Sequence, residues 1–229
     1  CHFARFLEYH HAYPVNGILA DLGVSSYQFD TPSRGFSHRY EGILDMRMNT
    51  NKGDSAQDVV NSYSHNQLSD MLFRFGELRN AYKIAESIVA ARQGAPILTT
   101  EDLTAAVKSF LPKGNENKVL SRIFQAIRIE VNHELEVLES FLNATPSALL
   151  PGGRLVVISY HSVEDRCVKN TLSPFEKECI CPEKLPVCRC GGNHRLLKKE
   201  NRKPLLPTST EIEKNPRARS AKLRVYTKV

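Results

Sequence analysis

The segment Val15-Asn-Gly-Ile-Leu-Ala-Asp-Leu22 decides the fold class. Its aliphatic residues show no regular alternation with polar ones, which is typical of a parallel-sheet strand covered on both faces. A second aliphatic strand is predicted over Leu155-Val-Val-Ile-Ser159, after the turn residues Pro151-Gly-Gly-Arg154. The segment 222–229 alternates apolar and basic residues, as an outer strand with one solvated face does. Such strands separated by helical patterns predict an α/β protein.

Helical patterns occupy most of the chain between the first two strands. Ser64-His-Asn-Gln67 has the form of a capping box at the start of a helix. A second helix is predicted over 77–93, and Thr99 or Thr100 is expected to cap a third. One long helix is then predicted to carry the apolar residues from Ile123 to Leu142. The first three helices have no strand between them, so we expect a small helical bundle.

Composition excludes several classes of protein. The 229 residues are 41% hydrophobic and 24% charged, which allows one large domain or two small ones. No apolar run approaches the roughly 18 to 20 residues of a membrane helix, and no secretory signal is visible, so we expect a cytoplasmic protein without a membrane partner. The net charge of +6 is concentrated at the end of the chain, because 195–229 contains eleven Lys and Arg against three acids. A basic segment of this kind favours either a phosphate-rich partner or a solvated surface.

Polar groups follow both predicted inner strands. Asp21 ends the first strand, and Ser159-Tyr-His161-Ser-Val-Glu-Asp165 follows the second, with Ser162 expected to cap a helix. Because ligands bind at the carboxyl ends of strands in open α/β sheets, we expect Asp21 and His161 to share a site. The alternative is that these residues only end strands and cap helices. A hydrolase is disfavoured because no Gly-x-Ser-x-Gly occurs, and no Gly-x-Gly pair indicates a glycine-rich cofactor loop.

Four cysteines form a compact pattern near the basic segment. They are Cys179, Cys181, Cys188 and Cys190. Four thiolates could hold a structural zinc ion, although zinc modules favour two or more residues between paired cysteines and here there is one. The alternative is a surface loop with reduced thiols, and nearby His194 could replace one sulfur.

Arginines are spaced in two places in a way that suits phosphate oxygens. Near the end of the chain the candidates for nucleic-acid contact are Arg217, Arg219, Lys222 and Arg224. Arg34 and Arg47 lie in 30–56, which is predicted to be a long ordered loop and combines cations with an aromatic residue. We expect both groups to contact a nucleic-acid backbone.

Seven motifs occur in order along the chain. They are Asp21-Leu-Gly-Val-Ser-Ser, Arg34-Gly-Phe-Ser, Leu44-Asp-Met-Arg-Met, Phe124-Gln-Ala-Ile-Arg-Ile-Glu-Val-Asn, Pro151-Gly-Gly-Arg, His161-Ser-Val-Glu-Asp-Arg and Asn215-Pro-Arg-Ala-Arg-Ser-Ala-Lys-Leu-Arg. Together they resemble the bacterial 16S rRNA cytosine-N4 methyltransferase family, also called RsmH or MraW. The resemblance extends from Phe3 to near the end of the chain.

The resemblance implies the C-terminal portion of a Rossmann-like class I methyltransferase sheet with an inserted all-helical domain. The methyltransferase domain would comprise 1–35 and 131–229, and the inserted domain, a candidate for RNA recognition, would comprise 36–130. The second methyltransferase segment would carry a Cys-rich loop over 179–194 and a basic tail over 195–229. The implied cofactor is S-adenosylmethionine, and the implied partner is 16S rRNA in the small ribosomal subunit.

The resemblance also assigns roles to residues. Phe3, Asp21 and Gln28 would contact S-adenosylmethionine. As a hypothesis for the mechanism, acceptors from Asp21, Ser25 and Ser26 would activate the cytosine amine, and His161 or Asp165 would remove the proton. The family's glycine-rich first loop lies upstream of Phe3, so we expect an N-terminally truncated chain that is inactive alone. The alternative is a non-catalytic RNA-binding or ribosome-assembly module. No oligomeric state is predicted.

Overall fold

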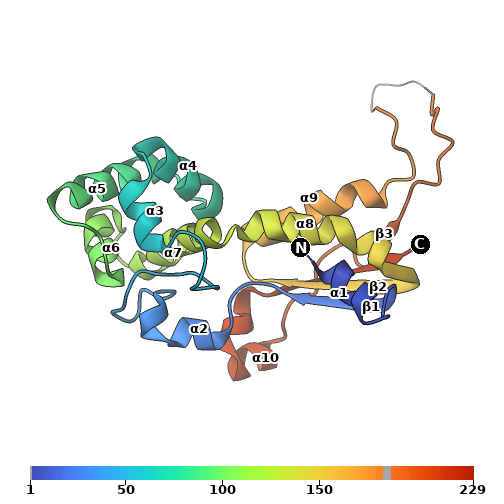
Figure 1. Cartoon of the computed structure of the whole chain (residues 1–229), viewed down its shortest axis with the longest axis horizontal. Coiled ribbons are helices and arrows are strands. Elements are labelled where there is room, and N and C mark those ends of the chain that lie inside the picture. The colour runs from blue at the N-terminus through green and yellow to red at the C-terminus, as the bar shows by residue number, and fades with distance from the viewer. Residues whose placement is uncertain (1, 183–186) are drawn as a thin grey trace. The chain divides into compact units, whose positions relative to one another are not determined.

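The computed structural model describes residues 2–182 and 187–229. Residues 183–186, within the Cys-rich loop predicted over 179–194, lie outside the described residues, as does Cys1. The chain divides into two compact units. Unit 1 joins Cys1–Gly23 to Leu135–Val229, and unit 2 is Val24–Glu134, which includes the predicted helical domain over 36–130. Figure 1 shows the elements of both units.

Unit 1 contains a four-stranded mixed sheet (Figure 1). Its strands are β1 (Val15–Asp21), β2 (Leu149–Ser159), β3 (Leu197–Lys199) and β4 (Lys222–Lys228). The strand order is β1-β2-β4-β3. β1 runs parallel to β2, whereas β4 runs antiparallel to both β2 and β3. The predicted α/β class is confirmed in this general form, and the Rossmann-like classification stays a prediction.

Two expectations about the sheet are wrong. β1 is not covered on both faces, because Leu19 is 68% exposed. In the described part of the chain β1 pairs with β2 alone, so it is an edge strand. β4 lies inside the sheet rather than at its outer edge, and its buried side chains are Arg224 and Tyr226 instead of the apolar alternates. The alternating pattern predicted that the basic residues face solvent. Arg224 is buried instead because its partner Asp165 offsets the cost of burying its charge.

β2 begins earlier than predicted because its turn residues lie inside the strand. Its pairing with β1 shifts register between Val15 and Gly17, so the strand contains an irregularity there. Gly152 adopts a φ of +79°, which favours glycine. At Gly153 a Cβ atom would lie 2.8 Å from the Leu150 carbonyl oxygen, so a side chain does not fit. The predicted turn therefore forms as a bulge between β1 and β2.

Two helices cover the sheet of unit 1 on the same side (Figure 1). They are α8 (Glu134–Ala148) and α9 (Ser162–Leu172). Leu142 of α8 and Leu172 of α9 join Leu155, Val157 and Tyr226 of the sheet in one apolar core. The smaller elements of unit 1 are α1 (Phe3–Tyr9), η3 (Ser173–Glu176), α10 (Ser209–Lys214) and η4 (Pro216–Ser220).

Unit 2 is helical. Its elements are α2 (Ser26–Asp30), η1 (Pro32–Arg34), α3 (Ala56–Ser62), α4 (His65–Gly76), α5 (Ala81–Gly94), α6 (Thr100–Val107), η2 (Lys108–Phe110) and α7 (Glu116–Asn132). The capping box at Ser64 is confirmed, and Thr99 caps α6. The segment between η1 and α3 lacks helices but buries Phe36, Leu44 and Met46 in the core of the unit, so it is an ordered loop as predicted.

The single long helix predicted through Leu142 is wrong. It breaks into α7 and α8 at His133, which adopts a φ of +49°. Across the break, Arg128 donates from Nε and Nη2 to the two carboxylate oxygens of Glu134, at 2.7 and 3.0 Å. Residues six positions apart do not share a face of a continuous helix, so this ion pair requires the break. None of the helices in the described part of the chain is long and apolar enough to cross a membrane.

Candidate active site

The carboxyl ends of β1 and β2 bring Asp21 beside the residues that follow Ser159. The two strands are parallel, and Asp21 pairs with Ile158. The Tyr160 hydroxyl donates to Oδ1 of Asp21 at 2.8 Å, and the Asp21 side chain is exposed. The expected meeting of Asp21 with the His161 segment is therefore present in unit 1. We call Asp21, Tyr160, His161 and Glu164 the strand-end cluster.

His161 and Glu164 form the second half of the strand-end cluster. His161, not Ser162 as predicted, is the N-cap of α9, because its Nδ1 accepts from the Glu164 backbone N–H at 3.2 Å. Its Nε2 lies 3.0 Å from Oε1 of Glu164. Since Nδ1 accepts, the neutral ring carries its proton on Nε2 and donates it to the carboxylate. The other Glu164 oxygen accepts from the Tyr160 backbone N–H at 2.9 Å, and Glu164 is buried.

Tyr160 is the functional candidate that the sequence did not reveal. Burial raises the pKa of Tyr160 to about 12, and the hydrogen bond to Asp21 adds to this effect. The hydroxyl therefore stays protonated at neutral pH and acts as a fixed donor to Asp21. The only signal in the sequence was its position between Ser159 and His161 at the strand end.

Asp165 and Arg224, predicted for catalysis and for RNA contact, form a buried ion pair instead. Arg224 donates from Nε to Oδ1 at 2.6 Å and from Nη2 to Oδ2 at 3.2 Å, and Lys222 Nζ lies 3.6 Å from Oδ2. Burial alone would raise the pKa of Asp165, but the hydrogen bonds and charge of Arg224 hold it below its usual value. A carboxylate stabilised in this way is a poor base, so the structure assigns the pair to joining α9 and β4.

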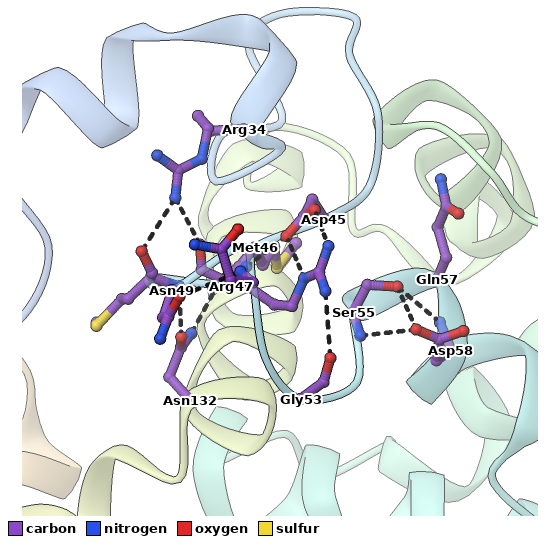
Figure 2. Close-up of polar contacts among 12 residues, drawn as sticks. Arg34, Asp45, Met46, Arg47, Asn49, Gly53, Ser55, Gln57, Asp58 and Asn132 are labelled. Atoms are coloured by element: carbon purple, nitrogen blue, oxygen red, sulfur yellow. Dashed lines mark hydrogen bonds and ion pairs between the residues drawn. The ribbon is translucent and has the colours of Figure 1, made fainter.

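Arg34 and Arg47 were predicted to bind RNA. In the structure, both guanidinium groups instead contact groups of unit 2 itself (Figure 2). Arg34 Nη2 donates to the carbonyls of Arg47 and Met48, at 2.6 and 3.3 Å. Arg47 donates to both carboxylate oxygens of Asp45, at 3.0 and 2.8 Å, and from Nη1 to the Gly53 carbonyl at 3.2 Å. We call Arg34, Asp45, Arg47 and Asn132 the loop network.

Asn132, at the end of α7, completes the loop network. Its Oδ1 accepts from the Met48 backbone N–H at 2.7 Å, and its Nδ2 donates to the Met46 carbonyl at 2.8 Å (Figure 2). Met46 has a φ of +58°, so these bonds support a backbone conformation that is unusual for a residue other than glycine. The loop network therefore stabilises the loop by internal contacts.

The predicted cofactor residues fall in both units. In unit 1, Phe3 lies in α1 with its ring centroid 5.1 Å from that of Phe141. In unit 2, Ser25 caps α2, and Gln28 Oε1 accepts from the Ser25 backbone N–H at 2.9 Å. Ser26 is the first residue of the same short helix. The sequence did not indicate that Ser25 and Gln28 form a capping box.

The remaining candidates are basic residues of the tail and the four cysteines. Arg217 and Arg219 are exposed in η4, whereas Lys222 is half-buried. The sulfurs of the four predicted metal ligands all lie within 4.8 Å of one another. His194, the predicted substitute for one of these sulfurs, has its Nε2 3.1 Å from the Cys190 carbonyl oxygen instead.

Comparison with known proteins places the chain in a family. The model of the MraW methylase family matches residues 1–229. Ribosomal RNA small subunit methyltransferase H of Fusobacterium nucleatum is 47% identical over 215 residues, which are 94% of this chain and 68% of that protein. The proteins of the same name from Bacteroides thetaiotaomicron and Flavobacterium johnsoniae are 46% and 48% identical, over 98% of this chain and 72% and 73% of their own length. The chain belongs to the MraW methylase family.

Proposed function

We propose that the protein transfers a methyl group from S-adenosylmethionine to the exocyclic N4 amine of a cytidine in 16S rRNA of the small ribosomal subunit. One observation carries the proposal: the exposed carboxylate of Asp21, held by Tyr160, at the carboxyl edge of two parallel strands. Membership of a methylase family and the names of the relatives, which are ribosomal RNA small subunit methyltransferases, support it.

The residues of the strand end fit S-adenosylmethionine chemically. Asp21 is an exposed anion with one oxygen already fixed by Tyr160, and the amino and sulfonium groups of S-adenosylmethionine are cationic. Phe3 is half-buried and supplies an aromatic surface for adenine. Gln28 is a further proposed contact on the strength of the sequence motif alone. When bound, S-adenosylmethionine supplies an electrophilic methyl group on sulfur.

The role of Asp21 follows from the weak nucleophilicity of the cytosine amine, whose lone pair is delocalised into the ring. A carboxylate that accepts an amine N–H favours the pyramidal form in which the lone pair is available. Tyr160 fixes the direction of that carboxylate before the base arrives, so no reorganisation is needed at the moment of reaction. Ser25 and Ser26 are retained as further acceptors because they follow Asp21 closely in the sequence.

His161 is the proposed acceptor of the proton that the methylated amine must lose. Its neighbour Glu164 is buried, and Oε1 of Glu164 lies 3.0 Å from Nε2, so this carboxylate holds the imidazole ring in a fixed orientation. Nδ1 would first exchange its contact with the Glu164 N–H for the substrate proton. Asp165 leaves the proposal because Arg224 occupies it.

RNA contact is proposed for the exposed arginines of η4. Arg217 and Arg219 belong to the basic tail and present cations in a segment capped by Asn215. Arginine forks suit phosphate oxygens, and the target cytidine would have to be splayed out of its stack to reach the strand end. Arg34, Arg47 and Arg224 leave this proposal because their guanidinium groups serve internal contacts.

Substitution of Asp21 tests the proposal. The full-length protein and its Asp21→Asn variant are incubated with S-adenosylmethionine and unmethylated small subunits, and N4-methylcytidine is measured by nucleoside mass spectrometry. We expect Asp21→Asn to slow methylation at least about 100-fold, which corresponds to about 2.7 kcal/mol, with RNA affinity and thermal stability nearly unchanged. The matched control is Asp70→Asn, since Asp70 is an exposed acid of unit 2 that forms a surface ion pair with Arg74.

Two results would contradict the proposal. Unchanged turnover of Asp21→Asn would remove Asp21 from catalysis. Absence of methyl transfer by the unsubstituted full-length protein, together with RNA binding that weakens as salt increases, would favour the alternative of a non-catalytic RNA-binding module.

A further inference from the structure

The four-cysteine cluster, which we define as Cys179, Cys181, Cys188 and Cys190, has no part in the proposed methyl transfer. Its sulfurs nevertheless gather closely. Cys188 Sγ lies 3.5 Å from the sulfurs of both Cys179 and Cys190, and Cys190 Sγ lies 3.6 Å from Cys179 Sγ. All four sulfurs lie within 4.8 Å of one another. The cluster is in unit 1, between η3 and β3.

These distances match a tetrahedral zinc–thiolate site. A Zn–S bond of about 2.3 Å places the sulfurs of a tetrahedron about 3.8 Å apart. The measured separations are close to that value and well beyond the roughly 2.05 Å of a sulfur–sulfur bond. The structure thus gathers four thiols within 4.8 Å of one another without joining them in pairs.

The short spacing between paired cysteines is compatible with this arrangement. In an extended segment, residues two positions apart point to the same side of the chain. Cys188 and Cys190 show the result, because their sulfurs lie 3.5 Å apart. Two such Cys-x-Cys segments that face each other supply four ligands, so the single intervening residue that departs from the usual zinc motifs does not exclude zinc.

A backbone N–H group also points at one of the sulfurs. Arg189, the middle residue of the second pair, donates its N–H to Cys181 Sγ at 3.3 Å. This contact joins the two Cys-x-Cys segments to each other, because donor and acceptor lie in different pairs. The turn after the second pair contains Gly192, which adopts a φ of +73°, a conformation that glycine reaches without strain.

The two segments that carry the cysteines are also held together next to the cluster. The backbone N–H of Leu196 donates to the Phe175 carbonyl at 2.8 Å, and that of His194 donates to the Glu178 carbonyl at 3.1 Å. Arg195 adds an ion pair with Glu178 at 3.0 Å. These contacts hold the segments before and after the cysteines side by side, so little further ordering is needed when a metal ion binds.

We propose that the four-cysteine cluster binds one zinc ion through all four thiolates and that this ion stabilises the connection between η3 and β3. Binding transfers the thiol protons to water, and no oxidation is involved. Four thiolates leave no coordination position open, so the site is structural rather than catalytic. The proposal is independent of the methyl transfer proposed above.

Metal analysis of cysteine variants tests the proposal. The protein is purified under reducing conditions with zinc present, freed of loosely bound metal, and analysed for metal content and by Co²⁺ titration. We expect zinc equimolar with protein, and Co²⁺ spectra with thiolate charge-transfer bands and the visible bands of tetrahedral coordination. The double variant Cys179→Ser/Cys190→Ser should bind zinc more than about 100-fold more weakly. Cys167→Ser is the matched control, since Cys167 is a half-buried free cysteine of α9 outside the cluster.

If the double variant does not fold, removal of zinc from the unsubstituted protein by a chelator provides a second test. A strong chelator should lower the melting temperature, and added zinc should restore it. Equimolar zinc retained by the double variant, or no zinc in the unsubstituted protein, would overturn the proposal. An intact protein mass lower by two or four hydrogens, which would show one or two disulfides, would also overturn the proposal. So would iron bound in place of zinc.

Discussion

The strand-end cluster and the loop network are both rich in charged residues, yet their charges are used differently. In the strand-end cluster, Asp21 is exposed and its one described partner is the neutral hydroxyl of Tyr160. In the loop network, Arg47 and Asp45 neutralise each other, and Arg34 donates to backbone carbonyls. A ligand can therefore reach a charge in the first region, whereas the charges of the second serve the fold.

The difference shows what a sequence motif leaves undecided. Both regions resemble the same family, and both were expected to contact a ligand. Arg34 ends η1, and Arg47 lies in the loop that follows. This loop has few helical hydrogen bonds, so its carbonyls need other donors, and the two guanidinium groups supply them. The Asp165–Arg224 pair behaves like the loop network. Internal ion pairs should govern stability, and the strand-end cluster should govern activity.

The largest effect is expected from Arg224→Met, which leaves the buried carboxylate of Asp165 without its main partner. The side chains of the pair are 8% and 10% exposed. Removing one partner of such a pair typically costs about 3–5 kcal/mol of unfolding free energy, and urea denaturation measures the loss. Arg219→Met, at an exposed arginine of the same tail, should change stability by less than about 0.5 kcal/mol. Equal effects of the two substitutions would mean that the buried pair has no special role.

A smaller effect is expected from Asp45→Asn in the loop network. Arg47 keeps 25% of its side chain exposed, so solvent screens the pair and the loss should be about 1–2 kcal/mol at pH 7. Burial alone would raise the pKa of Asp45, but hydrogen bonds from Arg47 lower it. The stabilisation is therefore complete above the pKa of the unfolded chain, about 4, and disappears as the pH falls through the lowered pKa.

Urea denaturation of both proteins at pH 7 and near pH 2 checks this dependence on pH. The difference in stability between Asp45→Asn and the unsubstituted protein should shrink in acid. The exposed control Asp70→Asn should show almost no difference at either pH. A difference for Asp45→Asn that persists in acid would show that the charge of Asp45 is not its source.

The smallest effect is expected from Tyr160→Phe in the strand-end cluster, and it concerns activity. The variant loses only the hydrogen bond to the exposed Asp21, so the unfolding free energy should change by less than about 1 kcal/mol. Methylation should slow about tenfold, or about 1.4 kcal/mol, because the carboxylate is no longer oriented. Tyr82→Phe, which retains an exposed ring in unit 2, is the control. A loss of stability without a loss of rate would place Tyr160 among the structural residues.

Local features of the fold could be predicted from the sequence, whereas non-local ones could not. The capping box of Ser64 and the strand at Val15 follow from neighbouring residues. The strand order, which puts β4 inside the sheet, depends on pairing between distant segments. The break at His133 interrupts an apolar period that continues on both sides, so periodicity does not reveal it.

The candidate site could also be predicted only in part, because local rules cover some of its features and side-chain contacts decide the others. Parallel strand ends must share an edge, and this geometric rule placed Asp21 next to the His161 segment. No such rule identifies the donor that orients Asp21, or the carboxylate behind His161, because several residues near a strand end could do either. Side-chain directions decided in favour of Tyr160 and Glu164.

The bulge at Gly152 and Gly153 ties the strand-end cluster to a remote part of the chain. Between the pairs Val15–Leu149 and Gly17–Arg154, β2 advances by more residues than β1, and from there the two strands stay in step to Asp21. The alignment of Asp21 with Tyr160 is thus set near the opposite end of the strands. A side chain at Gly153 would push the backbones of β1 and β2 apart there. The resulting shift in register would pass along the paired strands to the carboxylate of Asp21, which the new side chain does not contact.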